Sequence, residues 1–201
     1  MGSAVSAYHF HEDEQWLRQM KAGDYTAFTA LYNKYIKGLT QYGLKFTADQ
    51  AIVEDCLHDL FVWCWSKRHE LEIQRSFKGY LMKSLRTGLL HRIEKEQRRN
   101  IRPITTDENY EFRLILSPEA VLMDREQDSI LRERVARLLD QLTARQREVI
   151  YLRYYEGLPF EEVARNMNLS VKACYKLMGR AIATLRETLP HSSLILLLWL
   201  C

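Results

Sequence analysis

The chain has 201 residues, with 47% hydrophobic and 27% charged side chains, which is the balance of an ordinary folded protein of one or two small domains. Its 8 glycines and 4 prolines are too few for a protein rich in hairpins, so helices are favoured. A net charge of +3 is too small to indicate a partner by itself.

Residue types and spacings exclude several kinds of site. The four cysteines, Cys56, Cys64, Cys174 and Cys201, form no CxxC pair and stand among apolar residues, so we expect reduced thiols rather than a zinc site or disulfides. The N-terminus, MGSAVSAYHFHEDEQW, lacks the basic start and apolar core of a signal peptide, and we expect a cytoplasmic protein. Without a Gly-rich phosphate loop, metal-ligand spacing or a nucleophile constellation, we predict no enzyme, cofactor, metal or small-molecule substrate.

The charge is distributed unevenly along the chain. Residues 67–102 contain eleven basic and four acidic side chains, a net charge of +7, whereas residues 103–128 carry a net charge of −5. Residues 132–186 are basic again. This order indicates two modules that face a polyanion and an acidic segment that stays off it, although each basic run alone fits a solvated helix face.

Helical periodicity runs through residues 12–100, which we predict to be a first domain. Asp24, after Gly23, is a candidate N-cap. Three amphipathic stripes follow, and their expected buried residues are Ala27, Phe28, Leu31, Tyr32 and Tyr35, then Val53, Cys56, Leu57, Leu60, Phe61, Cys64 and Trp65, then Phe77, Leu81, Leu85, Leu89 and Ile93, with Tyr80 near the same face. The opposite face of the third stripe is expected to carry Lys78, Lys83, Arg86 and Arg92.

Periodicity is weak over residues 101–128, which we predict to be an acidic linker. Residues 129–189 are again strongly helical, and residues 190–201 form an apolar tail. At eight residues, its run LILLLWLC is far shorter than the roughly 20 residues that span a bilayer, so we expect it to pack on its own domain or on a partner.

Residues 160–187 have the pattern of a helix-turn-helix. Phe160, Val163, Ala164 and Met167 form the inner face of a short helix, and Asn168 stands where a turn needs a left-handed backbone. Ser170 is a candidate N-cap for a second helix. We expect this second helix to bury Ala173, Cys174, Leu177, Ala181 and Leu185.

The outward face of the second helix suits DNA. Such a helix presents its first residues to the major groove, where lysines reach base edges or phosphates, a tyrosine packs on a thymine methyl, and an arginine holds a phosphate. A helical hairpin that contacts only protein is the alternative. The candidate DNA-binding residues are Ser170, Val171, Lys172, Tyr175, Lys176 and Arg180.

Two sets of motifs resemble the sigma factors of bacterial RNA polymerase. The run LLDQLTARQREVIYLRYYEGLPFEEVA, directly before the helix-turn-helix, resembles the start of sigma region 4. Residues 54–61, EDCLHDLF, together with Gly23-Asp24, Leu31-Tyr32 and Tyr80-Leu81, resemble sigma region 2. Both sets occur in the family's order in a short chain, which is typical of the extracytoplasmic-function (ECF) group of the sigma-70 family.

This resemblance implies an all-α fold of two small helical domains joined by a flexible linker. It also implies a role in promoter-specific transcription initiation, with region 4 on the −35 element and β flap, region 2 on the −10 element and β′ clamp, and an anti-sigma factor as a further partner. The implied polymerase-binding residues are Asp55, His58 and Asp59, where the family has Gln-Glu at His58-Asp59. The residues implied to capture the melted −10 strand are Lys78, Lys83, Arg86, Thr87 and Arg92, where the family has Asn at Thr87.

The predicted linker is long enough for binding at both elements. Elements 16–17 base pairs apart are separated by roughly 55 Å, and some 26 extended residues reach about 85 Å. Two rival functions fit the motifs less completely: a two-domain DNA-binding regulator that never joins polymerase, and a helical adaptor that contacts only protein.

Overall fold

A computed structural model of the chain describes residues 2–73, 76–99, 110–114 and 139–188. The chain divides into two compact units, Met1–Thr105 and Thr106–Cys201. Within the described residues, regular structure is helical throughout, which confirms the predicted all-α class. Three expectations lie outside the described residues: the apolar tail 190–201, the linker residues 101–109 and 115–128, and the predicted helical residues 129–138.

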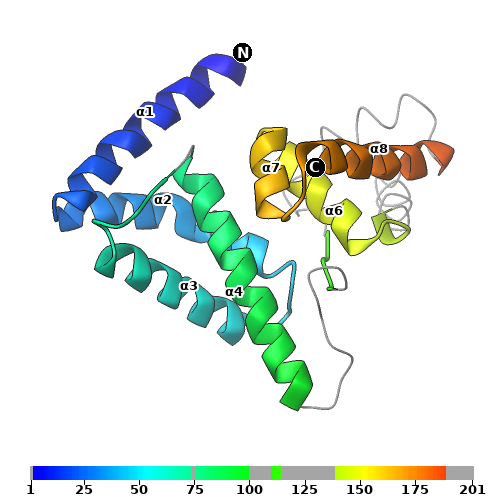
Figure 1. The fold of residues 1–201 in the computed structure, drawn as a ribbon, viewed down its shortest axis with the longest axis horizontal. Coiled ribbons are helices and arrows are strands. Elements are labelled where there is room, and N and C mark those ends of the chain that lie inside the picture. Colours follow the sequence, from blue (N-terminus) through cyan, green and yellow to red (C-terminus); the bar gives the residue numbers. More distant parts are fainter. Residues whose placement is uncertain (1, 74–75, 100–109, 115–138, 189–201) are drawn as a thin grey trace, which may run out of the picture. The chain divides into compact units, whose positions relative to one another are not determined.

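The described part of unit 1 contains four helices, α1 (Gly2–Lys21), α2 (Tyr25–Gly43), α3 (Gln50–Ser66) and α4 (Phe77–Arg99) (Figure 1). Helix α2 packs against each of the other three, and α3 also packs against α4. The stripes predicted from periodicity supply the core, because Leu31, Val53, Leu60, Leu81 and Leu89 are all buried.

The helix boundaries of unit 1 follow from short polar residues and one glycine. Gly23 ends α1 with a φ of 96°, and the Asp24 carboxylate then accepts hydrogen bonds from the first amides of α2, the nearer at 2.8 Å from Thr26. Asp49 caps α3 in the same way. At the start of α4 the Ser76 hydroxyl accepts from the Gly79 amide at 3.1 Å. The predicted cap at Asp24 is therefore confirmed.

Unit 2 contains α6 (Ala144–Ile150), the π-helical turn η2 (Tyr151–Tyr155), α7 (Phe160–Asn166) and α8 (Val171–Thr188) (Figure 1). Thr143 and Gln146 form a capping box at the start of α6. Helix α8 packs against α6 and α7.

The turn between α7 and α8 has the predicted chemistry. Asn168 has a φ of 52°, the left-handed conformation that Asn tolerates better than most residues. The Ser170 hydroxyl accepts a hydrogen bond from the Ala173 amide at 3.2 Å, as expected of an N-cap. These two residues set the direction in which α8 leaves the turn.

One part of the predicted linker is packed against unit 2. Residues 110–114 form an extended segment whose Phe112 side chain is only 1% exposed and whose Tyr110 is also buried. Within the predicted linker, this segment is docked on unit 2, because its two aromatic side chains are buried there. Across the helices that the structure describes, none is long and apolar enough to cross a membrane.

Candidate nucleic-acid interface

Helix α8 presents one polar face to solvent. Its buried side carries Cys174, Met178, Ala181 and Leu185, which follow one another at helical spacing, and Met178 joins this side although the expected set omitted it. All of the candidate DNA-binding residues are exposed; these are Ser170, Val171, Lys172, Tyr175, Lys176 and Arg180. The structure therefore brings the predicted DNA-binding residues of α8 to one surface.

An aromatic stack fixes Tyr175 on this surface. The Tyr175 and Phe160 rings are stacked, with their centroids 4.1 Å apart and their planes at 28°. The Arg153 guanidinium lies 5.0 Å from the Phe160 centroid on η2's side of the stack. Because Tyr175 stays 53% exposed, Phe160 supports its ring while leaving the rest of the side chain accessible.

The Arg153–Phe160–Tyr175 stack was missed by sequence reasoning. Phe160 matched the inner face of its helix and was assigned to the core, and Arg153 lies in a different element. The available signal was the excess of aromatic residues around α7, but their pairing depends on how three elements fold together.

The predicted basic face of α4 needs correction. We expected Lys78, Lys83, Arg86 and Arg92 on the exposed side, yet Arg86 is only 1% exposed and Lys78 and Arg92 are half-buried. Successive helical residues are about 100° apart, so Arg86 lies between the buried positions of Met82 and Gly79 around the helix. Lys78 and Arg92 stand seven residues to either side of Leu85, nearly two full turns away, and so lie on the core-facing side near the helix ends.

Lys83 and Thr87 do occupy the exposed side of α4. The Thr87 hydroxyl donates a hydrogen bond to the Lys83 carbonyl at 3.0 Å, which leaves its oxygen lone pairs to accept from another group. Next to this side, Tyr80 is half-buried and stacks on Trp63 of α3, with centroids 6.3 Å apart. Trp63 is 45% exposed and was not singled out from the sequence.

The predicted polymerase-binding residues of α3 share an exposed face. Asp55, His58 and Asp59 are all exposed. Arg92 of α4 bridges the two acids: its Nη1 donates to Asp55 Oδ2 at 2.9 Å, and its Nη2 is hydrogen-bonded to Asp59. Arg92, which was predicted to bind DNA, is therefore paired with Asp55 and Asp59, which were predicted to bind polymerase.

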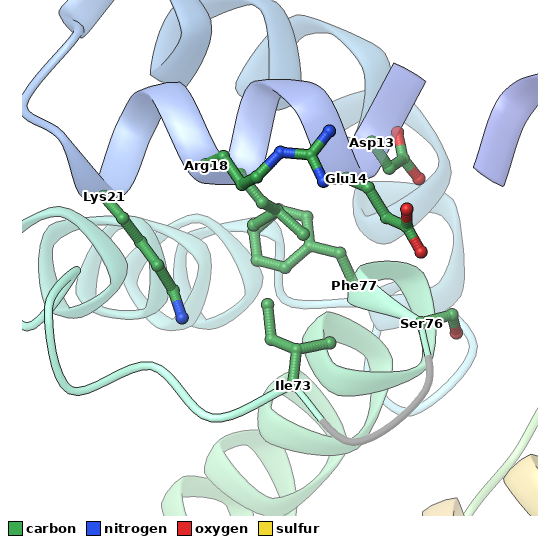
Figure 2. A pocket seen from close by; sticks show the side chains of 8 residues that line it. Asp13, Glu14, Arg18, Lys21, Ile73, Ser76 and Phe77 are labelled. Atoms are coloured by element: carbon green, nitrogen blue, oxygen red, sulfur yellow. The ribbon is translucent and has the colours of Figure 1, made fainter. Parts of the chain in front are cut away.

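A pocket of about 220 Å³ lies between α1 and the residues that lead into α4. Figure 2 shows Asp13 and Glu14 at one end and Lys21 at the other, with Ile73 and Phe77 between them. Asp13 accepts hydrogen bonds from Lys34 Nζ at 2.7 Å and from the Tyr35 hydroxyl. Ile73 and Ser76, which precede α4, thus border a concave site with charges of both signs.

Comparison with known proteins identifies the family. Residues 31–99 match the model of Sigma-70 region 2, and residues 132–185 match the model of Sigma-70 region 4. The chain is 30% identical over 181 residues to the ECF RNA polymerase sigma factor SigK of Mycolicibacterium vanbaalenii, and the match covers 86% of this chain and 87% of the relative. The chain belongs to the ECF sigma factors of the sigma-70 family.

Other relatives agree with this assignment. The chain is 24% identical over 171 residues to SigL of Mycobacterium tuberculosis, which covers 85% of this chain and 93% of that protein. Among solved structures, its fold resembles CnrH, solved in complex with the cytosolic domain of CnrY, at a TM-score of 0.56 and 24% identity over 88% of this chain and 96% of that one. It also resembles RpoE of Bartonella quintana, solved with the anti-sigma factor NepR, at a TM-score of 0.57 and 20% identity over 80% of this chain and 95% of that one.

The protein is thus an RNA polymerase sigma factor, and its family comprises transcription initiation factors rather than catalysts. Unit 1 of this sigma factor holds region 2, and unit 2 holds region 4. The surfaces on α3, α4 and α8 belong to the parts of the chain that define the family.

Proposed function

We propose that this sigma factor binds core RNA polymerase through α3 and places α4 and α8 on the −10 and −35 elements of a promoter. The observation that carries the proposal is the presence of both sigma regions in one chain, each with an exposed polar surface on the helix that the resemblance assigns to DNA. Because polymerase and chromosome share the cytoplasm, we infer that the protein acts there.

Helix α8 suits the major groove of the −35 element. Lys172 and Lys176 are exposed one turn apart, and Arg180 continues the same face. Lysines at these positions reach base edges or phosphates, and the supported Tyr175 ring offers an apolar surface to a thymine methyl. In this proposal Ser170 acts through its cap, which orients the start of α8.

The exposed side of α4 suits melted DNA at the −10 element. Binding of a single strand needs cations for phosphates and aromatic surfaces on which bases stack. Lys83 provides the cation, and the Trp63–Tyr80 pair provides an aromatic surface beside it. The pocket lined by Glu14, Arg18 and Phe77 offers a concave site for an extruded base. Buried Arg86 is left out of this set.

The acidic face of α3 suits a protein partner. Asp55 and Asp59 present carboxylates at a spacing of one helical turn, and His58 lies beside them. We propose that this face docks on the β′ clamp of polymerase and that Arg92 positions the two acids for it. Arg92 then contributes to polymerase affinity rather than to contact with a −10 phosphate.

Paired substitutions on α4 separate these roles. Lys83→Ala is expected to weaken binding of melted DNA by the holoenzyme and to reduce the slope of log affinity against log salt by about 1. Arg92→Ala is expected to leave that slope unchanged and to weaken binding to core polymerase, measured by titration of labelled protein. If Arg92→Ala instead reduced the slope of log DNA affinity against log salt and left affinity for core polymerase unchanged, Arg92 would be a DNA-binding residue after all.

An anti-sigma factor is a further proposed partner. CnrH and RpoE, two proteins that this chain resembles in fold, were each solved with a partner protein, CnrY and NepR respectively. Co-purification of this sigma factor with a protein that blocks its transcription activity would identify the partner.

Run-off transcription tests the main proposal. Core polymerase is supplied with a library of promoter fragments in the presence and absence of the protein. A sigma factor makes initiation start at defined positions, whereas a two-domain regulator binds DNA without enabling initiation. DNA binding without protein-dependent start sites would therefore favour the regulator.

A further inference from the structure

The extended segment 110–114, named the strap here, lies before the residues that match Sigma-70 region 4 but belongs structurally to unit 2. Tyr110 and Phe112 are buried, while Glu111 and Arg113 are exposed and pair with each other at 3.0 Å. Alternation of buried and exposed side chains is typical of an extended chain that lies on a surface. The compact unit that carries region 4 therefore includes residues that the family match does not cover.

Hydrogen bonds to α6 hold the strap in place. Arg147 donates from Nη1 to the Phe112 carbonyl at 3.0 Å and from Nε to the Leu139 carbonyl at 2.9 Å, so one guanidinium joins the strap to the residues that precede α6. The Tyr110 hydroxyl is hydrogen-bonded to the buried carboxylate of Glu148. Because these contacts fix the backbone of the strap, the Phe112 side chain has a defined position.

The Phe112 side chain supports the π-helical turn η2. Its ring makes an edge contact with the Tyr151 ring, with centroids 5.8 Å apart, and Tyr151 stacks on Tyr155 with centroids 5.1 Å apart. Phe112 and Tyr151 are almost fully buried, at 1% and 2% exposure. The Glu156 amide donates to the Tyr151 carbonyl five residues back, and such turns are rare in helices and frequent at functional sites. The strap thus packs on the buried side of an unusual turn.

The same turn carries Arg153, whose side chain supports Tyr175 through Phe160. Arg153 Nη1 donates to the Leu158 carbonyl at 3.0 Å, and its guanidinium lies 5.0 Å from the Phe160 centroid. Phe160 in turn stacks on Tyr175 with centroids 4.1 Å apart. Arg153 and Tyr151 belong to one five-residue turn that is closed by its own backbone hydrogen bond. Because so short a turn moves as one body, a shift at Tyr151 also displaces the Arg153 side chain.

We propose that Phe112 of the strap is a positioning residue for recognition of the −35 element. It holds η2 through Tyr151, and η2 in turn keeps the side chains that support Tyr175 in place. The proposal rests on the function proposed above, because the contact of Tyr175 with the −35 element is part of that function. A residue of the predicted linker then contributes to promoter recognition without contacting DNA.

The environment of the Tyr175 ring in the free, full-length protein tests the first step. In protein labelled with fluorotyrosine, the fluorine NMR signal of Tyr175 is the one that Tyr175→Phe removes. Phe112→Leu keeps an apolar side chain and is expected to shift this signal in the same direction as Phe160→Leu does, because both changes loosen the stack. Glu111→Ala, at an exposed position next to Phe112, is the control and is expected to leave the signal unchanged. An unshifted signal in Phe112→Leu would overturn the proposal. Loss of the folded-state signals in both Phe112→Leu and Phe112→Met would overturn it as well, because the role of Phe112 would then be purely structural.

Promoter binding tests the consequence for recognition. Holoenzymes are titrated with promoter DNA whose −35 element is intact or scrambled. Phe112→Leu is expected to weaken binding to the intact element about twofold or more, which is the lower end of the coupling between residues of one network. The loss is expected to disappear in the Tyr175→Ala background and with the scrambled element. A loss of equal size in both backgrounds would show that Phe112 acts only through the stability of unit 2, and would refute positioning. If the holoenzyme does not distinguish the two promoters at all, the proposed function fails, whereas the fluorine signal still decides whether Phe112 positions Tyr175.

Discussion

The aromatic support of Tyr175 can be removed with little change in apolar volume. Phe160→Leu keeps an apolar side chain at the first position of α7 but removes the ring that stacks on Tyr175 with centroids 4.1 Å apart. It also removes the surface over which the Arg153 guanidinium lies. The exposed Tyr175 side chain is then free to adopt other rotamers, and ordering it on DNA costs more conformational entropy.

The size of the effect follows from the strength of an aromatic pair. Such pairs contribute about 0.5–1.5 kcal/mol beyond their buried area, and a tenfold change in affinity corresponds to about 1.4 kcal/mol. If the whole contribution appears in DNA binding, Phe160→Leu weakens affinity for the −35 element by roughly 2- to 12-fold. The loss should depend on the presence of Tyr175, because Phe160 acts through it.

A double-mutant cycle measures that dependence. Holoenzymes carrying wild-type sigma factor, Phe160→Leu, Tyr175→Ala or both are titrated, at fixed salt, with labelled promoter DNA that has an intact or a scrambled −35 element. Tyr154→Leu serves as a control because Tyr154 is another exposed aromatic residue in unit 2. Losses that add within about 0.5 kcal/mol would show that Phe160 and Tyr175 act independently and would refute the reasoning.

Four further outcomes test the fold. A Cβ at Gly43 would lie 2.6 Å from Val53 Cγ1, so Gly43→Ala should lower the free energy of unfolding by about 1–3 kcal/mol in denaturant titrations, and Val53→Ala in the same chain should restore part of it. Asn168→Val should cost about 1–2 kcal/mol at a φ of 52°, and Asn168→Gly should cost less, as thermal unfolding would show. Burial raises the pKa of the Cys56 thiol to about 11 and that of Cys64 to about 12, so in the native protein both should resist iodoacetamide at about pH 8 and react once it is unfolded, as followed by mass spectrometry. Since these pKa values lie above the ordinary thiol value of 9.0, the folded state should also lose stability as the pH rises from 9.0 towards 11. Rapid alkylation of native Cys64, or unchanged stability of the Gly43 or Asn168 variants, would contradict the packing described here.

Helix α8 and the turn before it are the part of the molecule that the sequence determined most completely. Ser170 caps α8, Asn168 adopts the left-handed turn, and Lys172, Tyr175 and Arg180 face outward, all as predicted. Each of these features depends on residues within one or two helical turns. Capping, positive φ and helical spacing are local rules, and a local pattern in the sequence is enough to apply them.

In helix α4 the same local rules did not predict correctly which residues are buried. Its large apolar residues outline a narrow stripe, but α2 and α3 both pack on α4, and the buried arc is wider than the stripe. Arg86 falls within the added width. The fraction of a helix surface that is buried depends on how many other helices pack on it. That number cannot be predicted from the sequence of the one helix.

The remaining features join residues that are far apart in the chain. Arg92 bridges Asp55 and Asp59 across 37 and 33 positions, and Arg147 reaches the Phe112 carbonyl across 35. Composition, helical periodicity and the sigma motifs determined by themselves that the regular structure of the described residues is helical and that α8 presents an exposed polar face. Only the tertiary structure decided which cations are engaged with acids, which arginine is buried and which part of the expected linker is docked. Those properties depend on contacts between elements that are far apart in the chain. The residue pattern of either element alone does not reveal which contacts it makes.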